Sequence, residues 1–260
     1  MGDFEFSLYP QDARLLTNRR AIVTGADSGI GQSTAFELAA HGAAVAINHV
    51  GDDSTARAMA EAIEAGGGKA VTVQMDVSQE ADVQRGFAEA KDAFGGLDLL
   101  VNNAGLEEPY ELVDMPLESW EKVLGVNLTG AFLCCREAAR LMDGGGSIVV
   151  NTSVHEVMPW MRYSHYAASK GGLKLFVQSI AKELAPRGIR VCSVAPGAID
   201  TPINAGVDQS VTRDEIPWGR WGQPIEIARA IAWLASDQAE YVVGTTLFVD
   251  GGMTLYPGAD

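Results

Sequence analysis

Cysteine is scarce in this sequence of 260 residues. The three cysteines are Cys134, Cys135 and Cys192, and none of them belongs to a CxxC motif. So few cysteines in this arrangement provide neither a disulfide framework nor a zinc site. Cys134 and Cys135 lie in an apolar helical pattern, so we expect them to pack in the core. We expect no metal site in this protein.

Positive charge is also scarce, because 19 Lys and Arg residues stand against 34 Asp and Glu residues. The formal net charge of −15 gives a surface that repels phosphate backbones and anionic lipids. A nucleic-acid or membrane partner is therefore disfavoured. The acidic residues form no single tract that would act as an interaction tail, so we interpret the charge as a source of solubility.

Long apolar runs are missing, since none reaches the roughly 18 residues that a membrane-spanning helix needs. The first twenty residues contain no apolar core of a secretory signal. Gly2 is followed by Phe6 where a myristoylation signal needs Ser or Thr. We therefore expect a soluble cytoplasmic protein.

Short apolar segments that end in glycine or polar residues alternate with helical patterns along the chain. An apolar fraction of 47% is enough for a large core. A long helix is expected at about 117–142. The fold class that this alternation predicts is α/β, a single-domain Rossmann-like, doubly wound parallel sheet with helices on both faces. It has about seven strands, at 21–25, 43–48, 69–77, 97–105, 146–153, 189–197 and 245–252.

No linker or change of composition divides the chain. We expect residues 1–18 to form a peripheral arm and residues 19–260 to form one domain. The polar stretch 201–217 has few periodic apolar positions, and it is either a mobile lid over a site or an ordinary surface excursion.

The segment TGADSGIG, residues 24–31, joins the first strand to the first helix. Its glycines are spaced GxxxGxG rather than GxGxxG. Glycine still lets the backbone approach a pyrophosphate closely, and the start of a helix offers unpaired N–H groups. The position after the first strand therefore indicates a dinucleotide site.

Four motifs together resemble those of the short-chain dehydrogenase/reductase family. They are TGxxxGIG, the Asp76–Val77 pair after the third strand, NNAG at 102–105 and PG at 196–197. The resemblance spans nearly the whole chain and implies an NAD(P)-dependent oxidoreductase. The cofactor contacts that it implies are Gly25, Asp27, Ser28, Gly29, Ile30, Gly31, Asn48, Asp76, Val77, Asn103, Ala104, Gly105, Tyr166, Lys170, Pro196, Gly197, Ile199 and Thr201.

The end of the second strand bears on the choice of cofactor. An acidic residue there favours NAD, and a nearby arginine favours NADP. The strand ends in Asn48–His49–Val50, and no Arg or Lys occurs between Gly25 and Arg57. We expect NAD, with NADP possible.

The pair Tyr166 and Lys170 is separated by one helical turn, so both side chains share a helix face. A cation beside a phenol lowers its pKa from about 10, which suits a base in alcohol oxidation. Tyr163 has no such partner. We therefore expect Tyr166 to be the general base in oxidation and the general acid in reduction, with Lys170 tuning it.

The family resemblance completes a catalytic set of Asn127, Ser153, Tyr166 and Lys170. Ser153 ends the fifth strand and would hold the substrate oxygen, and Asn127 would hold a water molecule of a proton relay. A Ser-His-Asp hydrolase built on Ser153 is disfavoured, because the chain has no GxSxG elbow. Ser164 suits the N-cap of the helix that follows, and Ser169 is expected to be structural.

Longer peptides are similar to the glucose 1-dehydrogenase branch of the family: NNAGLEEP, SVHEVMPW, HYAASKGG, PGAIDTPINA and YVVGTTLFVDGGMTLYP. That similarity implies oxidation of the C1 hydroxyl of an aldose. It adds Glu107 and His155 to Ser153 and Tyr166 as substrate contacts. Trp160 would either stack on a sugar face or pack in the protein.

Two alternatives stay open. One is a short-chain carbonyl or 3-oxoacyl-type reductase with another substrate, and the other is a nucleotide-sensing binding protein on the same fold. The family resemblance also implies a homotetramer, formed through the long helices and the last strand. Whether the enzyme is a sugar dehydrogenase or a reductase, we expect a small-molecule substrate, and we prefer a sugar.

Overall fold

A parallel sheet of seven strands forms the centre of the protein. The computed structural model describes residues 4–205 and 216–255. The strand order is β3-β2-β1-β4-β5-β6-β7, and every pairing is parallel. The strands are β1 (Arg20–Val23), β2 (Ala44–His49), β3 (Lys69–Gln74), β4 (Leu99–Asn102), β5 (Gly146–Asn151), β6 (Ile189–Pro196) and β7 (Thr246–Val249). The predicted seven-stranded sheet is therefore confirmed.

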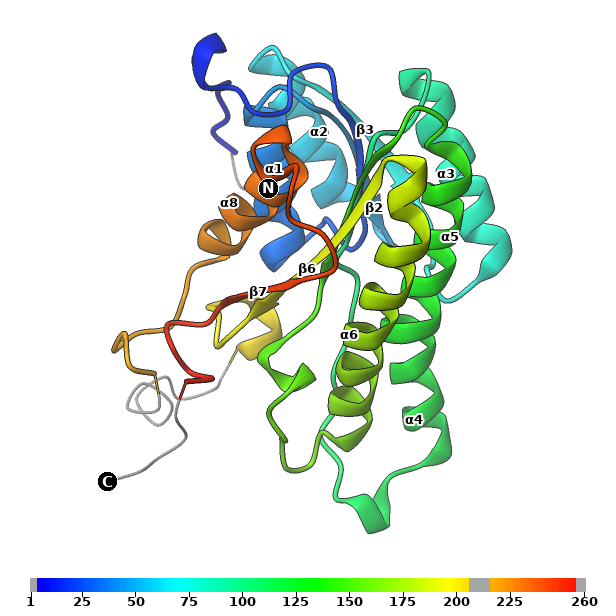
Figure 1. Cartoon of the computed structure of the whole chain (residues 1–260), viewed down its shortest axis with the longest axis vertical. Helices are drawn as coiled ribbons and strands as arrows, with labels where there is room; N and C mark the ends of the chain where they lie inside the picture. Colours follow the sequence, from blue (N-terminus) through cyan, green and yellow to red (C-terminus); the bar gives the residue numbers. More distant parts are fainter. Residues whose placement is uncertain (1–3, 206–215, 256–260) are drawn as a thin grey trace.

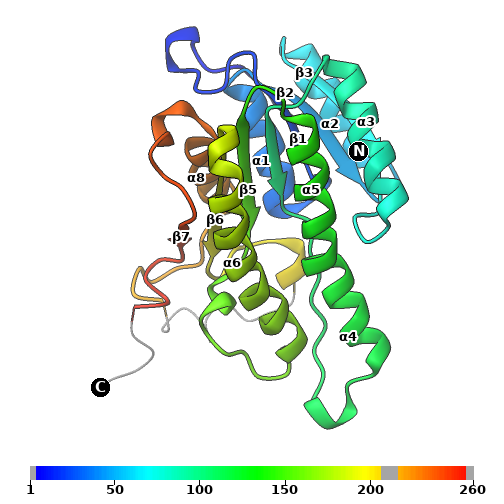
Figure 2. The same ribbon diagram turned by 45° about the vertical axis from the view of Figure 1, so that its right-hand side comes forward.

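Helices cover both faces of this sheet, as expected. One face carries α1 (Gly29–Ala40), α2 (Ser54–Ala65) and α8 (Pro224–Ala235). The other carries α3 (Glu80–Phe94), α5 (Ala131–Leu141) and α6 (Ser164–Leu184), with α4 (Leu117–Leu124) extending beyond the sheet (Figures 1 and 2). The strands read as nearly continuous apolar runs because both faces are buried.

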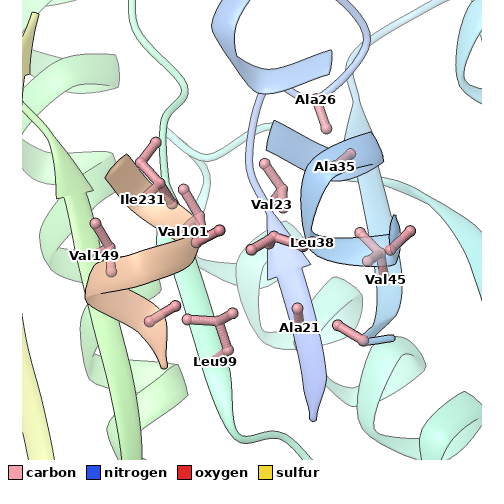
Figure 3. Close-up of a cluster of buried hydrophobic side chains, with 14 of the residues drawn as sticks. Ala21, Val23, Ala26, Ala35, Leu38, Val45, Leu99, Val101, Val149 and Ile231 are labelled. Carbon is pink, nitrogen blue, oxygen red and sulfur yellow. The ribbon is translucent and has the colours of Figure 1, made fainter. Parts of the chain in front are cut away.

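The apolar core is split by the sheet into two clusters. On the face covered by α1 and α8, Val23, Val101 and Val149 of neighbouring strands meet Leu38 and Ile231 (Figure 3). The second cluster lies under α3, α5 and α6 and contains Cys134 and Cys135. The three cysteines are free and buried, so the expected packing role of this pair is confirmed.

The long helix expected at 117–142 is not a uniform α-helix. It consists of α4, a π-helical turn at Gly125–Gly130 and α5, which continue one another (Figure 2). Such a turn has one additional residue per hydrogen-bonded ring and often occurs at functional sites. Asn127 lies inside this π-helical turn, so the geometry of the turn sets the direction of the Asn127 side chain.

The sheet reverses its strand order between β1 and β4. Val23 of β1 pairs with Val101 of β4, while the crossover after β1 runs the other way to β2. Ligands of doubly wound sheets bind in the crevice outside the carboxyl ends of the strands at this switch point. The glycine-rich loop and the NNAG segment are both placed there.

The N-terminal arm lies against the first two helices. The rings of Phe4 and Phe6 contact Phe36 of α1 at 5.4 and 6.1 Å. A Cβ atom on Gly66 would lie 2.4 Å from the Phe6 ring, so glycine permits this approach. Leu16 is buried, with 1% of its surface exposed.

One expectation concerns the polar stretch in the C-terminal half, and two findings concern all the residues described. Within the stretch 201–217, residues 206–215 lie outside the described residues, so the lid remains a prediction. In the described ranges, no helix combines the length and hydropathy needed to cross a membrane. The same ranges hold no cluster of three His, Cys, Asp or Glu residues arranged for a metal ion.

Candidate active site

The loop between β1 and α1 is shaped by three glycines. Gly25 and Gly29 have φ angles of +57° and +53°, in the left-handed region that favours glycine. A Cβ atom on Gly31 would lie 2.0 Å from the Gly25 carbonyl oxygen. Helix α1 begins at Gly29, and Ser28 makes no side-chain capping bond to the residues described. The first N–H groups of α1 are therefore available to an anionic ligand.

Three polar side chains brace this loop. Thr24 Oγ1 accepts hydrogen bonds from the backbone N–H groups of Asn103 and Ala104, both at 2.9 Å. The Asn103 amide donates to the carbonyls of Thr24 and Gly25, each at 3.0 Å. Asn48 Oδ1 accepts from the Gly25 N–H at 3.0 Å. Asn48 was expected to contact the cofactor. Its Oδ1 instead stabilises the loop that would hold the cofactor.

A single cavity of about 710 Å³ collects the expected residues. Every predicted cofactor and substrate contact lines it, and of the catalytic four only Asn127 is not part of its lining. Its volume lies in the range of small-molecule sites. The loop after β6 closes the other side, because Thr201 Cγ2 would be 3.4 Å from a Cβ on Gly29.

Ser153, Tyr166 and Lys170 meet at the centre of this cavity. Ser153 follows β5 and hydrogen-bonds to the phenol of Tyr166. Lys170 Nζ lies 5.4 Å from the centre of the Tyr166 ring. It donates a hydrogen bond to the carbonyl oxygen of Asn151 at 3.0 Å. The helical spacing thus brings tyrosine and lysine to one face, as the sequence predicts.

The expected lowering of the Tyr166 pKa is wrong for the protein alone. Burial raises the pKa of the Tyr166 phenol above its usual value, the Ser153 hydrogen bond lowers it, and Glu107 raises it further. Burial also lowers the pKa of Lys170 from 10.5 to about 8. The enclosure that brings the two groups together disfavours both charged forms. Their attraction does not offset this desolvation.

Asn127 has the specific partners that an asparagine inside a helix requires. Its Oδ1 accepts from the Leu106 N–H, and its Nδ2 donates to the Leu106 carbonyl, both at 2.9 Å. Nδ2 also lies 3.1 Å from Ser169 Oγ. Asn127 therefore fixes the loop before Glu107, and Ser169 has the structural role expected of it. The water that Asn127 would hold stays a prediction.

Glu107 and His155 line the same cavity, close to Tyr166 and Lys170. Burial raises the pKa of Glu107 from 4.5 to about 7, and Lys170 partly opposes this. Burial lowers the pKa of His155, and its bond to the Met158 carbonyl partly opposes this. Burial therefore favours the neutral forms of both the His155 imidazole and the Glu107 carboxyl group.

Trp160 is not free to stack on a sugar. Its indole is nearly parallel to His155, at 4.3 Å and 8°, and to Tyr163, at 3.8 Å and 14°. Trp160 therefore packs within the protein, which was the alternative considered for it. The Tyr166 ring meets it edge-on, at 5.8 Å and 76°.

One helix cap and several site residues differ from the expectations. The N-cap of α6 is Tyr163, and Ser164 is the first helical residue, so the predicted cap is wrong. Asn151 and the apolar lining residues Met158, Trp221 and Met253 were not among the residues expected from the sequence. The position of Asn151 at the end of a strand was the only signal for it.

These features fit a bound dinucleotide. Left-handed glycines, unpaired N–H groups at the start of α1 and a crevice at the switch point are what a pyrophosphate and its two nucleosides need. The glycine-rich loop and the residues around it would hold the adenosine and pyrophosphate, and Thr201 lies against Gly29 of that loop.

A short-chain dehydrogenase/reductase family model, described as enoyl-(acyl carrier protein) reductase, matches residues 25–254. The chain belongs to the short-chain dehydrogenase/reductase family. It is thus an NAD(P)-dependent oxidoreductase acting on a CH–OH group.

Relatives in this family differ in substrate. The chain is 46% identical over 254 residues to 3β-hydroxysteroid dehydrogenase 1 of Eggerthella lenta, covering 94% of this chain and 96% of that protein. It is 44% identical over 246 residues to glucose 1-dehydrogenase of Gluconobacter oxydans, covering 92% of each. A short chain dehydrogenase from Burkholderia cenocepacia, solved in complex with NADP, is 36% identical with a TM-score of 0.89, covering 92% of this chain and 99% of that one.

Proposed function

We propose that this enzyme oxidises the C1 hydroxyl of an aldose, with Asn127, Ser153, Tyr166 and Lys170 as its catalytic set. The observation that carries the proposal is the placement of Glu107 and His155 in the same cavity as Ser153 and Tyr166. A sugar ring needs several hydrogen-bond partners around it, and carboxylate and imidazole groups supply them. The similarity to a glucose 1-dehydrogenase supports the same substrate class.

In the proposed reaction the side chains position the substrate and move one proton. Ser153 holds the C1 oxygen, and Tyr166 accepts the hydroxyl proton as the C1–H bond breaks. Bound nicotinamide supplies the acceptor for the electron pair of that bond. Lys170 favours the phenolate when charged, although its lowered pKa limits this above about pH 8.

A second candidate is a 3-hydroxysteroid. The cavity wall includes the apolar side chains of Met158, Trp221 and Met253, which suit a rigid hydrocarbon skeleton. The similarity to a 3β-hydroxysteroid dehydrogenase favours the same reading. A steroid would leave Glu107 and His155 without hydroxyl partners, so we place the aldose first.

A substrate panel tests the proposal. Purified enzyme is mixed with D-glucose, two other aldoses or a 3β-hydroxysteroid, each with NAD or NADP, and nicotinamide reduction is followed. We expect the highest kcat/KM with an aldose. Turnover of the steroid alone would replace the aldose, while turnover of neither would remove both substrates.

We further propose that NAD is preferred over NADP. Val50 follows β2 with 63% of its surface exposed and offers no charge to a 2′-phosphate. The nearest Arg or Lys along the chain is Arg57, which pairs with Asp53. We therefore expect the substrate panel to give a higher kcat/KM with NAD than with NADP.

We also propose that the enzyme is a cytoplasmic homotetramer. Phe132 of α5 and Leu175 of α6 are 42% and 65% exposed, and β7 forms an edge of the sheet. Apolar groups on helices and an unpaired strand edge are typical of subunit contacts. Light scattering after gel filtration would give four times the chain mass of 27.5 kDa.

A further inference from the structure

His155 is held in one tautomer by its neighbours. Its Nδ1 lies 3.2 Å from the carbonyl oxygen of Met158. A carbonyl only accepts hydrogen bonds, so Nδ1 must carry the proton. In the neutral ring, Nε2 is then the acceptor, and within the residues that the structure describes it has no hydrogen-bond partner.

Trp160 fixes the plane of that ring. The His155 and Tyr163 rings each lie nearly parallel to the indole and close to its centre, at 4.3 and 3.8 Å. Two rings cannot occupy the same space over one indole, so they cover opposite faces. Trp160 is thus the middle of a three-ring stack, which we call the aromatic stack: His155, Trp160 and Tyr163.

The aromatic stack stands directly beside the catalytic tyrosine. Tyr166 meets His155 edge-on at 6.1 Å and Trp160 edge-on at 5.8 Å. His155 and Trp160 both line the cavity. A ring held in this way has little rotational freedom to lose when a ligand binds, which is how a preorganised group gains affinity.

We propose that Trp160 is a positioning residue that holds His155 as a hydrogen-bond acceptor for a hydroxyl group of the substrate. This inference rests on the proposed function, because it requires a substrate with a hydroxyl besides the reacting one. Trp160 acts through His155 and does not itself touch the substrate. A 3-hydroxysteroid with no second hydroxyl would gain nothing from the arrangement.

A double-mutant cycle tests whether Trp160 acts through His155. The variants are His155→Phe, which keeps an aromatic ring and removes the acceptor, Trp160→Leu, and both together. We expect each single variant to raise KM for the best aldose roughly 3- to 10-fold, the value of one neutral hydrogen bond, with kcat within about twofold. The double variant should be no worse than His155→Phe. A double variant whose KM is the product of the two single effects would overturn the proposal.

Two variants serve as matched controls. Trp160→Phe can still stack, so we expect it to restore KM to within about twofold of the wild type. Trp233 lies on α8 with 37% of its surface exposed, and Trp233→Leu should leave KM unchanged. Failure of Trp160→Phe to restore KM would contradict the stacking role.

The tautomer is tested in the wild type, independently of how the Trp160 variants fold. The chain contains four histidines, so nitrogen-15 labelling of histidine gives few signals, and His155→Phe assigns those of His155. We expect a protonated Nδ1 and an unprotonated Nε2. The opposite tautomer would overturn the proposal. Inactivity of the wild type on all aldoses would overturn the proposed function as well, whereas additivity in an active enzyme overturns only the role of Trp160.

Discussion

Glu107 is the side chain in the cavity whose protonation changes nearest to neutral pH. Burial raises its pKa from 4.5 to about 7. The folded protein therefore binds this proton more tightly than the unfolded chain does, and folded stability falls as pH rises from about 4.5 to about 7. Above about pH 7 the carboxylate is ionised, and the free energy of unfolding is reduced by the full cost of burying that charge.

Replacement of Glu107 by glutamine should remove this penalty. A fully enclosed group with this shift would cost roughly 3 kcal/mol, and partial solvent exposure reduces the expected gain to about 1 to 2 kcal/mol at pH 8. The gain should shrink toward zero as the pH approaches 4.5. Urea unfolding of both proteins at pH 5 and pH 8 measures it, with the exposed Glu121→Gln as control. An equal gain at both pH values would contradict the assigned cause.

The pKa of Tyr166 is a residue-level property that the spacing of the motif does not predict. The spacing of Tyr166 and Lys170 correctly predicts that they share a helix face. It carries no information on burial, and burial determines the direction of both pKa shifts. The expectation that the Tyr166 pKa lies below its usual value failed for this reason. Trp160 is a similar case, because its two ring partners were not evident from the sequence.

At the scale of elements, the π-helical turn between α4 and α5 links the helix to the active site. The turn directs Asn127 toward the backbone of Leu106, next to Glu107. The helical pattern of the sequence predicted one long helix, because apolar periodicity does not register a single additional residue in one turn. The strands and their order of appearance were predictable, since their apolar runs are bounded by glycine and polar residues.

Asn127→Leu should destabilise the protein by about 2 kcal/mol, because it leaves the Leu106 N–H and carbonyl without their partners. The loop that carries Glu107 should loosen as well, which would raise KM. Urea unfolding and steady-state kinetics measure the two effects. Thr129 lies in the same turn but is exposed, so Thr129→Ala should change stability by no more than about 0.5 kcal/mol. Equal losses in both variants would remove the assigned role of Asn127.

At the scale of the whole molecule, the active site and the N-terminal arm are separate. The site occupies the carboxyl ends of the strands, whereas the arm lies on α1 and α2 through Phe4 and Phe6. No arm residue lines the cavity among the residues described. We therefore expect the arm to contribute to stability and to leave kcat/KM unchanged.

Phe6→Ala tests this separation. Phe6 is half-buried, so we expect a loss of about 1 to 2 kcal/mol in the free energy of unfolding, below the cost of emptying a full core position. The value of kcat/KM should not change. The exposed neighbour Ser7→Ala serves as control in the same unfolding assay. A fall in kcat/KM in Phe6→Ala at a temperature where it stays folded would connect the arm to the site.

In the proposed reaction Tyr166 transfers the proton of the reacting hydroxyl. The decisive measurement is the turnover of Tyr166→Phe with the best substrate and cofactor of the wild type, together with the Kd of the cofactor. We predict a loss of ~10²-fold or more in kcat with an unchanged cofactor Kd, because phenylalanine keeps the ring and removes only the acid–base group. Wild-type turnover in a variant that binds cofactor normally would contradict the account.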